Sequence, residues 1–270
     1  MKQKISNINS LEKALKLLLL FTEGQPQWGV REMSAHVGFS PATVQRLLKT
    51  LKAYDFVRQS AASRRYRLGN IYFRFFHALQ SSYSIIQAAL PVMTRLSAAT
   101  RETVHLNIIE GLERVTIETI ESTLPLKAGM PIGSRAPLYA GASAKCLLAF
   151  SAAPFRNRYV GEVHLQPFTT RTIRSRNTLL KALALIREKG YAKSLGERNP
   201  GLGSLSAPIF NHDDRIMAAI SLAVPEIRFK AVKRQERYLT ALMKAAAEIS
   251  TMAGYKKPTQ QEKKDAQCQQ

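Results

Sequence analysis

Residues 38–51 read GFSPATVQRLLKTL, and this stretch decides how the N-terminal third of the chain is interpreted. Gly38 suits a tight turn, Ser40 is placed to cap a helix, and Pro41 fits the first helical position. These signals predict a helix over 41–54 with two different faces. The apolar face holds Val44, Leu47, Leu48 and Leu51, and the other face holds Ala42, Thr43, Gln45, Arg46, Lys49 and Lys52.

The flanking segments complete a winged helix-turn-helix. A helix over 10–22 is predicted from Asn9 as N-cap with Glu12 placed as in a capping box, and a short helix over 30–37 follows. Residues 56–58 and 65–68 alternate in character around a small, polar tip, which is typical of a two-stranded hairpin. In the first helix, the residues recurring at helical spacing are expected to form the apolar face: Leu11, Leu15, Leu18 and Leu19.

This architecture suits double-stranded DNA, because a helix fits the major groove and its N-terminal residues can meet base edges. Arg46 could form a bidentate contact with guanine, whereas Lys49 is better suited to phosphate. The predicted DNA-binding residues are Ser40, Ala42, Thr43, Gln45, Arg46 and Lys49 on the helix and Arg58, Arg64 and Arg65 on the wing. The alternative is an ordinary three-helix bundle with solvated charges.

The charge distribution favours DNA binding. The chain has 270 residues, with 40 Lys and Arg against 19 Asp and Glu and a formal net charge of +21. Residues 1–80 hold 13 basic and 4 acidic residues, which makes them about twice as charge-dense as the middle of the chain. Such an excess predicts a polyanionic partner. A membrane surface would also fit the charge, but no apolar run approaches the roughly 20 residues that span a bilayer, so no membrane partner is expected.

The cysteines and histidines carry no sign of metal or redox chemistry. Cys146 and Cys268 lie far apart, so neither a disulfide framework nor a zinc cluster is predicted, and a reducing cytoplasm is the expected compartment. The histidines are scattered without metal spacing. His105 alternates with apolar neighbours and is expected to be a half-buried structural residue. No cofactor and no metal site is predicted.

The rest of the chain predicts a second, mixed domain. A helix from about 70 to 82 carries Phe73 and Phe76, which are candidates for part of an interface with a second copy. After it, the pattern predicts helices over 85–100, 144–150, 177–189 and 235–252 and strands over 103–109, 113–118, 206–210 and 216–224. A Gly-, Pro- and Ser-rich loop is expected over 127–141. Residues 256–270 are polar and expected to be disordered.

Several stretches, in order and at the right spacing, resemble the IclR family of bacterial regulators. The resemblance begins at 10–15 (SLEKAL), runs through the recognition helix at 43–51 and covers nearly everything from Asn9 to Gly254. The other matching stretches are 65–69 (RYRLG), 133–138 (GSRAPL), 145–149 (KCLLA), 171–173 (RTI), 189–192 (KGYA) and 207–210 (APIF).

This resemblance implies an α+β chain in four parts: a winged helix-turn-helix over 8–69, a linker helix over 70–84, a GAF-like α/β effector-binding domain over 85–254 and a polar tail over 255–270. It also implies a dimer, or a dimer of dimers, on a pseudo-palindromic operator. The effector would be a small carboxylic or aromatic acid. By position, its pocket would be lined by Gly129, Ala142, Ser143, Ser194, Leu202, Ser204 and Ser221.

The sequence departs from the family pattern around this pocket. Ala144 stands where glycine is common and Gly203 where arginine is frequent. Ser204 replaces a frequent cysteine, and Ser194 occupies a position that is often acidic. These differences alter the charge and volume of the expected pocket, and so they bear on which effector it binds.

Two other classes of protein are the alternatives. Ser143 and Lys145 have the spacing of a Ser/Lys nucleophile pair, although Ser143 is more easily a helix cap beside a solvated lysine. No G-x-S-x-G elbow, P-loop or dinucleotide fingerprint is present, so an enzyme is not expected. An architectural DNA-binding protein would not need the large domain after the linker. The sequence therefore favours a transcriptional regulator whose DNA binding responds to a small metabolite.

Overall fold

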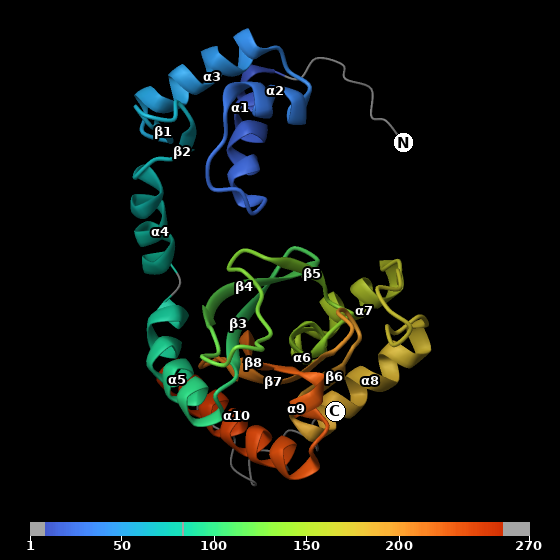
Figure 1. The fold of residues 1–270 in the computed structure, drawn as a ribbon. Helices are drawn as coiled ribbons and strands as arrows, with labels where there is room; N and C mark the ends of the chain where they lie inside the picture. Colours follow the sequence, from blue (N-terminus) through green and yellow to red (C-terminus); the bar gives the residue numbers. More distant parts are fainter. Residues whose placement is uncertain (1–8, 83, 256–270) are drawn as a thin grey trace. The chain divides into compact units, whose positions relative to one another are not determined.

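The computed structural model describes residues 9–82 and 84–255, and its contacts divide the chain into two compact units, the second beginning at Ser84. Figure 1 shows the helices and strands of both units. The tail over 256–270, for which the sequence predicts disorder, lies outside the described residues. Within those residues, no helix combines the length and apolarity that crossing a membrane requires.

The N-terminal unit is a winged helix-turn-helix, as predicted. Asn9 caps the first helix by accepting a 2.8 Å hydrogen bond from the Glu12 amide, but Glu12 itself pairs with Lys16 and closes no capping box. The side-chain bond that closes a capping box is found instead at the start of the second helix, where the Glu32 carboxylate accepts a 3.0 Å hydrogen bond from the Gly29 amide. The elements are α1 (Ser10–Leu19), a 3-10 turn η1 (Leu20–Thr22), α2 (Val30–Val37), α3 (Pro41–Ala53), β1 (Val57–Gln59), β2 (Tyr66–Leu68) and α4 (Ile71–Ser82).

The predicted apolar face of α1 is wrong. Leu11, Leu15 and Leu19 are 69%, 51% and 60% exposed, and Leu18 only lies against the edge of the core. Four consecutive leucines followed by Phe21 leave two faces of this helix apolar, and packing against α2 and α3 selects the second. The core of the unit consists of Leu17, Leu20, Phe21, Trp28, Met33, Val44, Leu47, Leu48, Val57 and Tyr66.

The C-terminal unit is built on one antiparallel six-stranded sheet in the order β5-β4-β3-β8-β7-β6. The predicted strands and helices are all present, and Gly111, at φ +60°, turns the chain between β3 and β4. The elements are α5 (Ser84–Thr100), β3 (Thr103–Glu110), β4 (Glu113–Ile120), β5 (Arg135–Pro137), α6 (Ala142–Phe150), α7 (Ala153–Glu162), α8 (Arg176–Lys189), β6 (Ala192–Leu195), β7 (Leu202–Phe210), β8 (Ile216–Pro225), α9 (Glu226–Phe229) and α10 (Val232–Met252). The sequence did not predict β5, α7, β6 or α9.

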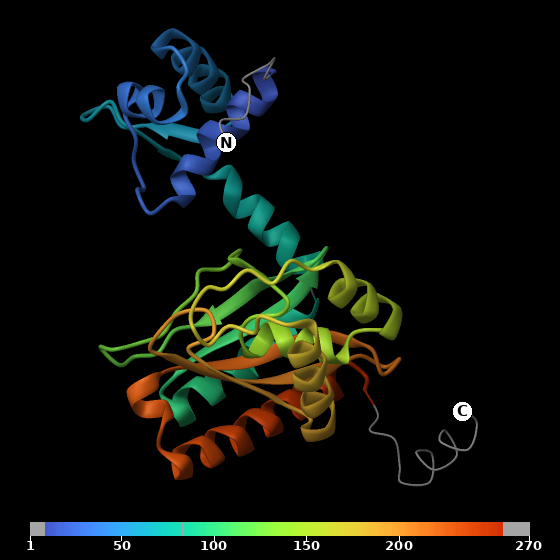
Figure 2. The same ribbon diagram turned by 90° about the vertical axis from the view of Figure 1, so that its right-hand side faces the viewer.

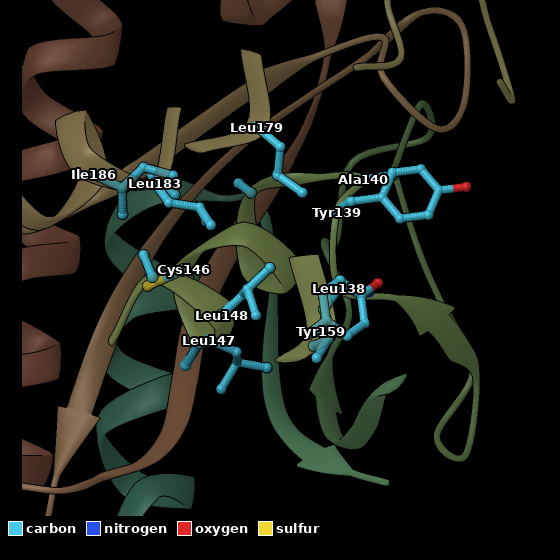
Figure 3. Close-up of a cluster of buried hydrophobic side chains, with 14 of the residues drawn as sticks. Leu138, Tyr139, Ala140, Cys146, Leu147, Leu148, Tyr159, Leu179, Leu183 and Ile186 are labelled. Atoms are coloured by element: carbon cyan, nitrogen blue, oxygen red, sulfur yellow. The ribbon is translucent and has the colours of Figure 1, made fainter. Parts of the chain in front are cut away.

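Helices cover both faces of this sheet. Figures 1 and 2 show α5 and α10 side by side along one face, and α6, backed by α8, on the other. Helix α6 is buried on nearly every side, and Cys146, Leu147 and Leu148 pack with Leu179 and Leu183 of α8 (Figure 3). This packing places the N-terminus of α6 beside the sheet.

Candidate nucleic-acid interface and ligand pocket

Helix α3 presents the predicted recognition surface to solvent. The Ser40 hydroxyl accepts a 3.3 Å hydrogen bond from the Thr43 amide and lies 2.9 Å from the Thr43 hydroxyl, so these two residues set the helix start. Ala42, Gln45, Arg46 and Lys49 are exposed. Among the residues that the structure describes, the side chains of Gln45, Arg46 and Lys49 form no hydrogen bond or ion pair, which leaves them available to a partner.

The wing arginines divide into two kinds. The Arg58 guanidinium donates hydrogen bonds of 2.7 and 3.2 Å to the Asp55 carboxylate. The Arg65 guanidinium donates bonds of 2.9 and 2.7 Å to the Glu32 carboxylate. Hydrogen bonds from Gly29 and then Arg65 lower the pKa of the Glu32 carboxyl. Arg65 therefore ties the wing to α2, whereas Arg58 braces the turn that leads into β1. Arg64, at the hairpin tip with φ +56°, is exposed and forms no side-chain bond within the described residues, so it is the freer DNA candidate.

Gly69 fixes the base of the wing. Its amide donates a 2.9 Å hydrogen bond to the Phe56 carbonyl. A Cβ atom at this position would lie 1.8 Å from the Asp55 carbonyl oxygen, which no side chain can tolerate. The glycine at the end of the RYRLG stretch is therefore required by the close approach of two backbone segments.

The second site is a pocket in the C-terminal unit, between the sheet and the N-terminus of α6. All seven residues predicted by resemblance line it: Gly129, Ala142, Ser143, Ser194, Leu202, Ser204 and Ser221. It opens to solvent at its mouth, and its cavity volume is about 70 Å³. The walls come from β3, β4, β6, β7 and β8, together with the loops at 128–130 and 197–199.

The serines of the pocket differ in what they can offer a ligand. Within the described part of the chain, the hydroxyls of Ser143, Ser194 and Ser204 form no hydrogen bond. The Ser221 hydroxyl accepts from the Asn107 side chain at 3.3 Å and donates to the Ser206 hydroxyl at 2.9 Å. Ser221 therefore belongs to a polar network across the sheet, whereas the other three have free hydroxyls.

A buried ion pair lies at the edge of the pocket, where Glu197 is one of the lining residues. The Lys145 ammonium binds the Glu197 carboxylate, and the side chains are only 6% and 11% exposed. Glu197 also accepts a 3.0 Å hydrogen bond from the amide of Gly141, the N-cap residue of α6. The expectation of a solvated Lys145 and a capping Ser143 is wrong: Gly141 is the cap, and Lys145 is committed to Glu197 rather than to Ser143.

Sequence reasoning missed the charged part of the pocket. Arg114 on β4 and Arg198 in the loop before β7 both line it. His105 also lines it and is fully buried rather than half-buried, and burial lowers its pKa to about 4. The alternation of His105 with apolar neighbours correctly predicts a strand, but it does not predict that the His105 side of β3 faces the pocket.

The glycine at position 203 has a structural explanation. A Cβ atom there would lie 2.3 Å from the ring of Phe229. The fully buried Phe229 side chain of α9 therefore lies where a larger residue at 203 would have to fit. A long side chain at this position, such as arginine, could fit only if this ring moved.

Comparisons with known proteins agree with this architecture. The family model described as "IclR helix-turn-helix domain" matches residues 10–61, and "Bacterial transcriptional regulator IclR C-terminal" matches residues 77–251. The HTH-type transcriptional regulator XynR of Escherichia coli strain K12 is 34% identical over 248 residues, covering 92% of this chain and 98% of XynR.

Solved structures match the fold along most of the chain. The crystal structure of the Thermotoga maritima IclR aligns with a TM-score of 0.82 at 27% identity and covers 92% of this chain and all of that one. An IclR homolog of Microbacterium hydrocarbonoxydans, complexed with 4-hydroxybenzoate, aligns with a TM-score of 0.78 at 20% identity, covering 90% and 98% of the two chains. At that identity the likeness shows the fold alone. The chain belongs to the IclR family of bacterial transcriptional regulators, with a helix-turn-helix domain and a C-terminal effector-binding domain.

Proposed function

We propose that this regulator binds a pseudo-palindromic operator through α3 and the wing tip, and that a small carboxylic acid in the C-terminal pocket changes its affinity for that operator. The observation that carries the proposal is a solvent-facing row of unpaired donors on a capped helix, Gln45, Arg46 and Lys49, in a strongly basic chain. Such a helix suits base edges and phosphates. Arg64 on the wing would add a contact to the backbone or an adjacent groove.

The pocket supports the sensing part of the proposal. It joins free hydroxyls, basic side chains and the N-terminus of α6, where helix amides favour negative charge. The Microbacterium homolog was crystallised with 4-hydroxybenzoate, which is itself a carboxylic acid. An effector can alter DNA binding only if it binds the DNA-competent and incompetent states with different affinities.

The exposed apolar side chains support self-association as a dimer or a dimer of dimers. Leu11, Leu15 and Leu19 line one face of α1, and Phe73 and Phe76 are exposed on α4. Large apolar side chains gathered on a surface are typical of protein interfaces. A two-fold dimer would present two recognition helices to two half-sites about 34 Å or a multiple of it apart.

The test begins with the DNA. Genome-wide mapping of bound DNA gives the operator, and anisotropy with the full-length chain then compares the operator with a scrambled duplex at fixed salt. A large preference for the operator, with pseudo-palindromic half-sites, is expected. Equal affinity for both duplexes would contradict the proposal. For the sensing part, operator DNA and effector must change each other's affinity by the same factor.

A further inference from the structure

Arg114 is a buried cation whose partners are all neutral. It is 1% exposed and donates to Asn107 at 3.3 Å, to the Thr116 hydroxyl, and to the carbonyl and hydroxyl of Ser134 at 3.4 Å. A further contact joins it to the Met130 sulfur at 3.5 Å. Its buried Nε has no hydrogen-bond partner. Burying a guanidinium this deeply is costly unless an anion compensates it.

No carboxylate of the described chain forms a hydrogen bond or ion pair with Arg114, and the nearby Glu113, whose charge acts on Arg114 without such a contact, is paired with Arg135. Within the described residues, the side chain of Arg198, the second arginine of the pocket, donates to the Met130 sulfur and the Arg135 carbonyl and to no carboxylate. Glu197 is the acidic residue lining the pocket, and Lys145 already neutralises it. Burial, followed by the charge of Arg198, lowers the pKa of Arg114 to about 10, so the guanidinium stays charged at neutral pH. The pocket therefore contains two guanidinium groups that are not paired with a carboxylate in the described part of the chain, and the more deeply buried of them is Arg114.

The remaining groups of the pocket are suited to hydroxyls. Ser143, Ser194 and Ser204 offer free hydroxyls. The neutral imidazole of His105 has a buried Nε2 with no hydrogen-bond partner, while its Nδ1 lies 3.0 Å from the Thr119 hydroxyl. Among the lining residues that the structure describes, none is Phe, Tyr or Trp, so a ligand ring would find none of these side chains to stack on.

We propose that Arg114, assisted by Arg198, is the counter-ion for the carboxylate of the effector, and that the effector is a hydroxylated aliphatic acid rather than an aromatic one. The carboxylate would complete the hydrogen bonding of the two guanidiniums, which match its planar geometry. The hydroxyls of the ligand would bond the free serines and His105. This inference rests on the proposed sensing function and names the ligand class and the residues that select it.

The test uses thermal unfolding of the full-length protein at constant ionic strength. The probes are glycerate and gluconate, their uncharged counterparts glycerol and sorbitol, and benzoate as an aromatic acid, all at equal concentration. At saturation, at least one hydroxy acid should raise the Tm of the wild type by roughly 5 °C. The polyols should have no such effect, and benzoate a smaller one.

Variants then assign the effect to Arg114. Arg114→Gln should abolish the Tm rise, and Arg114→Lys should keep part of it, because charge without the fork geometry still attracts a carboxylate. Arg135→Gln is the matched control, since Arg135 is exposed and already paired with Glu110 and Glu113. It should keep the full rise. If Arg114→Gln does not fold by circular dichroism, Arg198→Gln replaces it and should reduce the rise.

Three outcomes overturn the inference: no hydroxy acid raises the Tm of the wild type, the Arg114 and Arg135 variants respond equally, or benzoate is the stronger stabiliser. The operator assay is kept separate. A hydroxy acid that binds through Arg114 but leaves operator affinity unchanged supports the ligand assignment and contradicts the sensing function. An uncharged molecule that changes operator affinity by binding this pocket contradicts the ligand assignment alone.

Discussion

Replacing Lys145 with methionine should strip a buried carboxylate of its partner and destabilise the C-terminal unit. The two side chains are 6% and 11% exposed, so neither charge is well solvated. Removing one member of a buried ion pair typically costs about 3–5 kcal/mol. Glu197 keeps the Gly141 amide and some contact with water, which places the expected cost near the lower end, at about 3 kcal/mol. For a unit of this size, that lowers the midpoint of thermal unfolding by roughly 6–12 °C.

The assay can separate the two units because Trp28, the one tryptophan of the sequence, lies in the N-terminal unit. Circular dichroism follows both units, and Trp28 fluorescence follows the first alone. Lys127→Met is the matched control, since Lys127 pairs with Glu121 while both are exposed, and it should cost about 1 kcal/mol or less. In the double variant Lys145→Met/Glu197→Gln no carboxylate is stranded, so its cost should fall short of the summed single costs by roughly 2 kcal/mol. Equal costs for Lys145→Met and Lys127→Met, or simple additivity in the double variant, would refute the reasoning.

Four further predictions concern the wing, the recognition helix and the pocket. Arg46→Ala should lose about 1–3 kcal/mol of binding free energy at the operator and relax base preference at one position, whereas Lys49→Ala should weaken binding to all duplexes alike. Anisotropy titrations measure both effects. If Arg46→Ala discriminates between duplexes as well as the wild type does, Arg46 does not read a base. Gly69→Ala should destabilise the N-terminal unit by roughly 3 kcal/mol, because its Cβ would meet the Asp55 carbonyl at 1.8 Å. The unfolding curve followed by Trp28 fluorescence measures this loss of stability, and a loss below about 1 kcal/mol would contradict the prediction. The pKa of His105 falls from 6.5 to about 4 on folding, so the unfolded chain binds the extra proton and stability drops as pH falls below 6.5. Between pH 7 and pH 5 this histidine should cost about 2 kcal/mol, an increment that His105→Asn should lack in urea titrations. Ser204→Val should weaken an effector without unfolding the protein, whereas Ser221→Val should also destabilise it by breaking the bonds to Asn107 and Ser206; equal unfolding curves for the two variants would contradict this.

Family resemblance and sequence pattern predicted the positions of the candidate sites better than their charges. All seven pocket residues chosen by position line a single pocket, yet Arg114 and Arg198, the two arginines that also line it, were not among them. Neither arginine stands in a motif, and each could equally have been a solvated surface residue. Likewise, nothing in the local sequence distinguishes Arg64, which is unpaired, from Arg65, which is bound to Glu32 across 33 positions.

The sequence by itself determined the features that depend on neighbours within a turn or two: the Asn9 and Ser40 caps, the turn at Gly111 and the alternating strands of the sheet. It left open the short strands β5 and β6, because three or four residues carry too little pattern and take their conformation from the strands they pair with. Only the tertiary structure decided which leucines of α1 are buried and which charges are paired. Burial and ion pairing depend on segments brought together from far apart in the chain, as Lys145 and Glu197 are across 52 positions, and no local pattern encodes that distance.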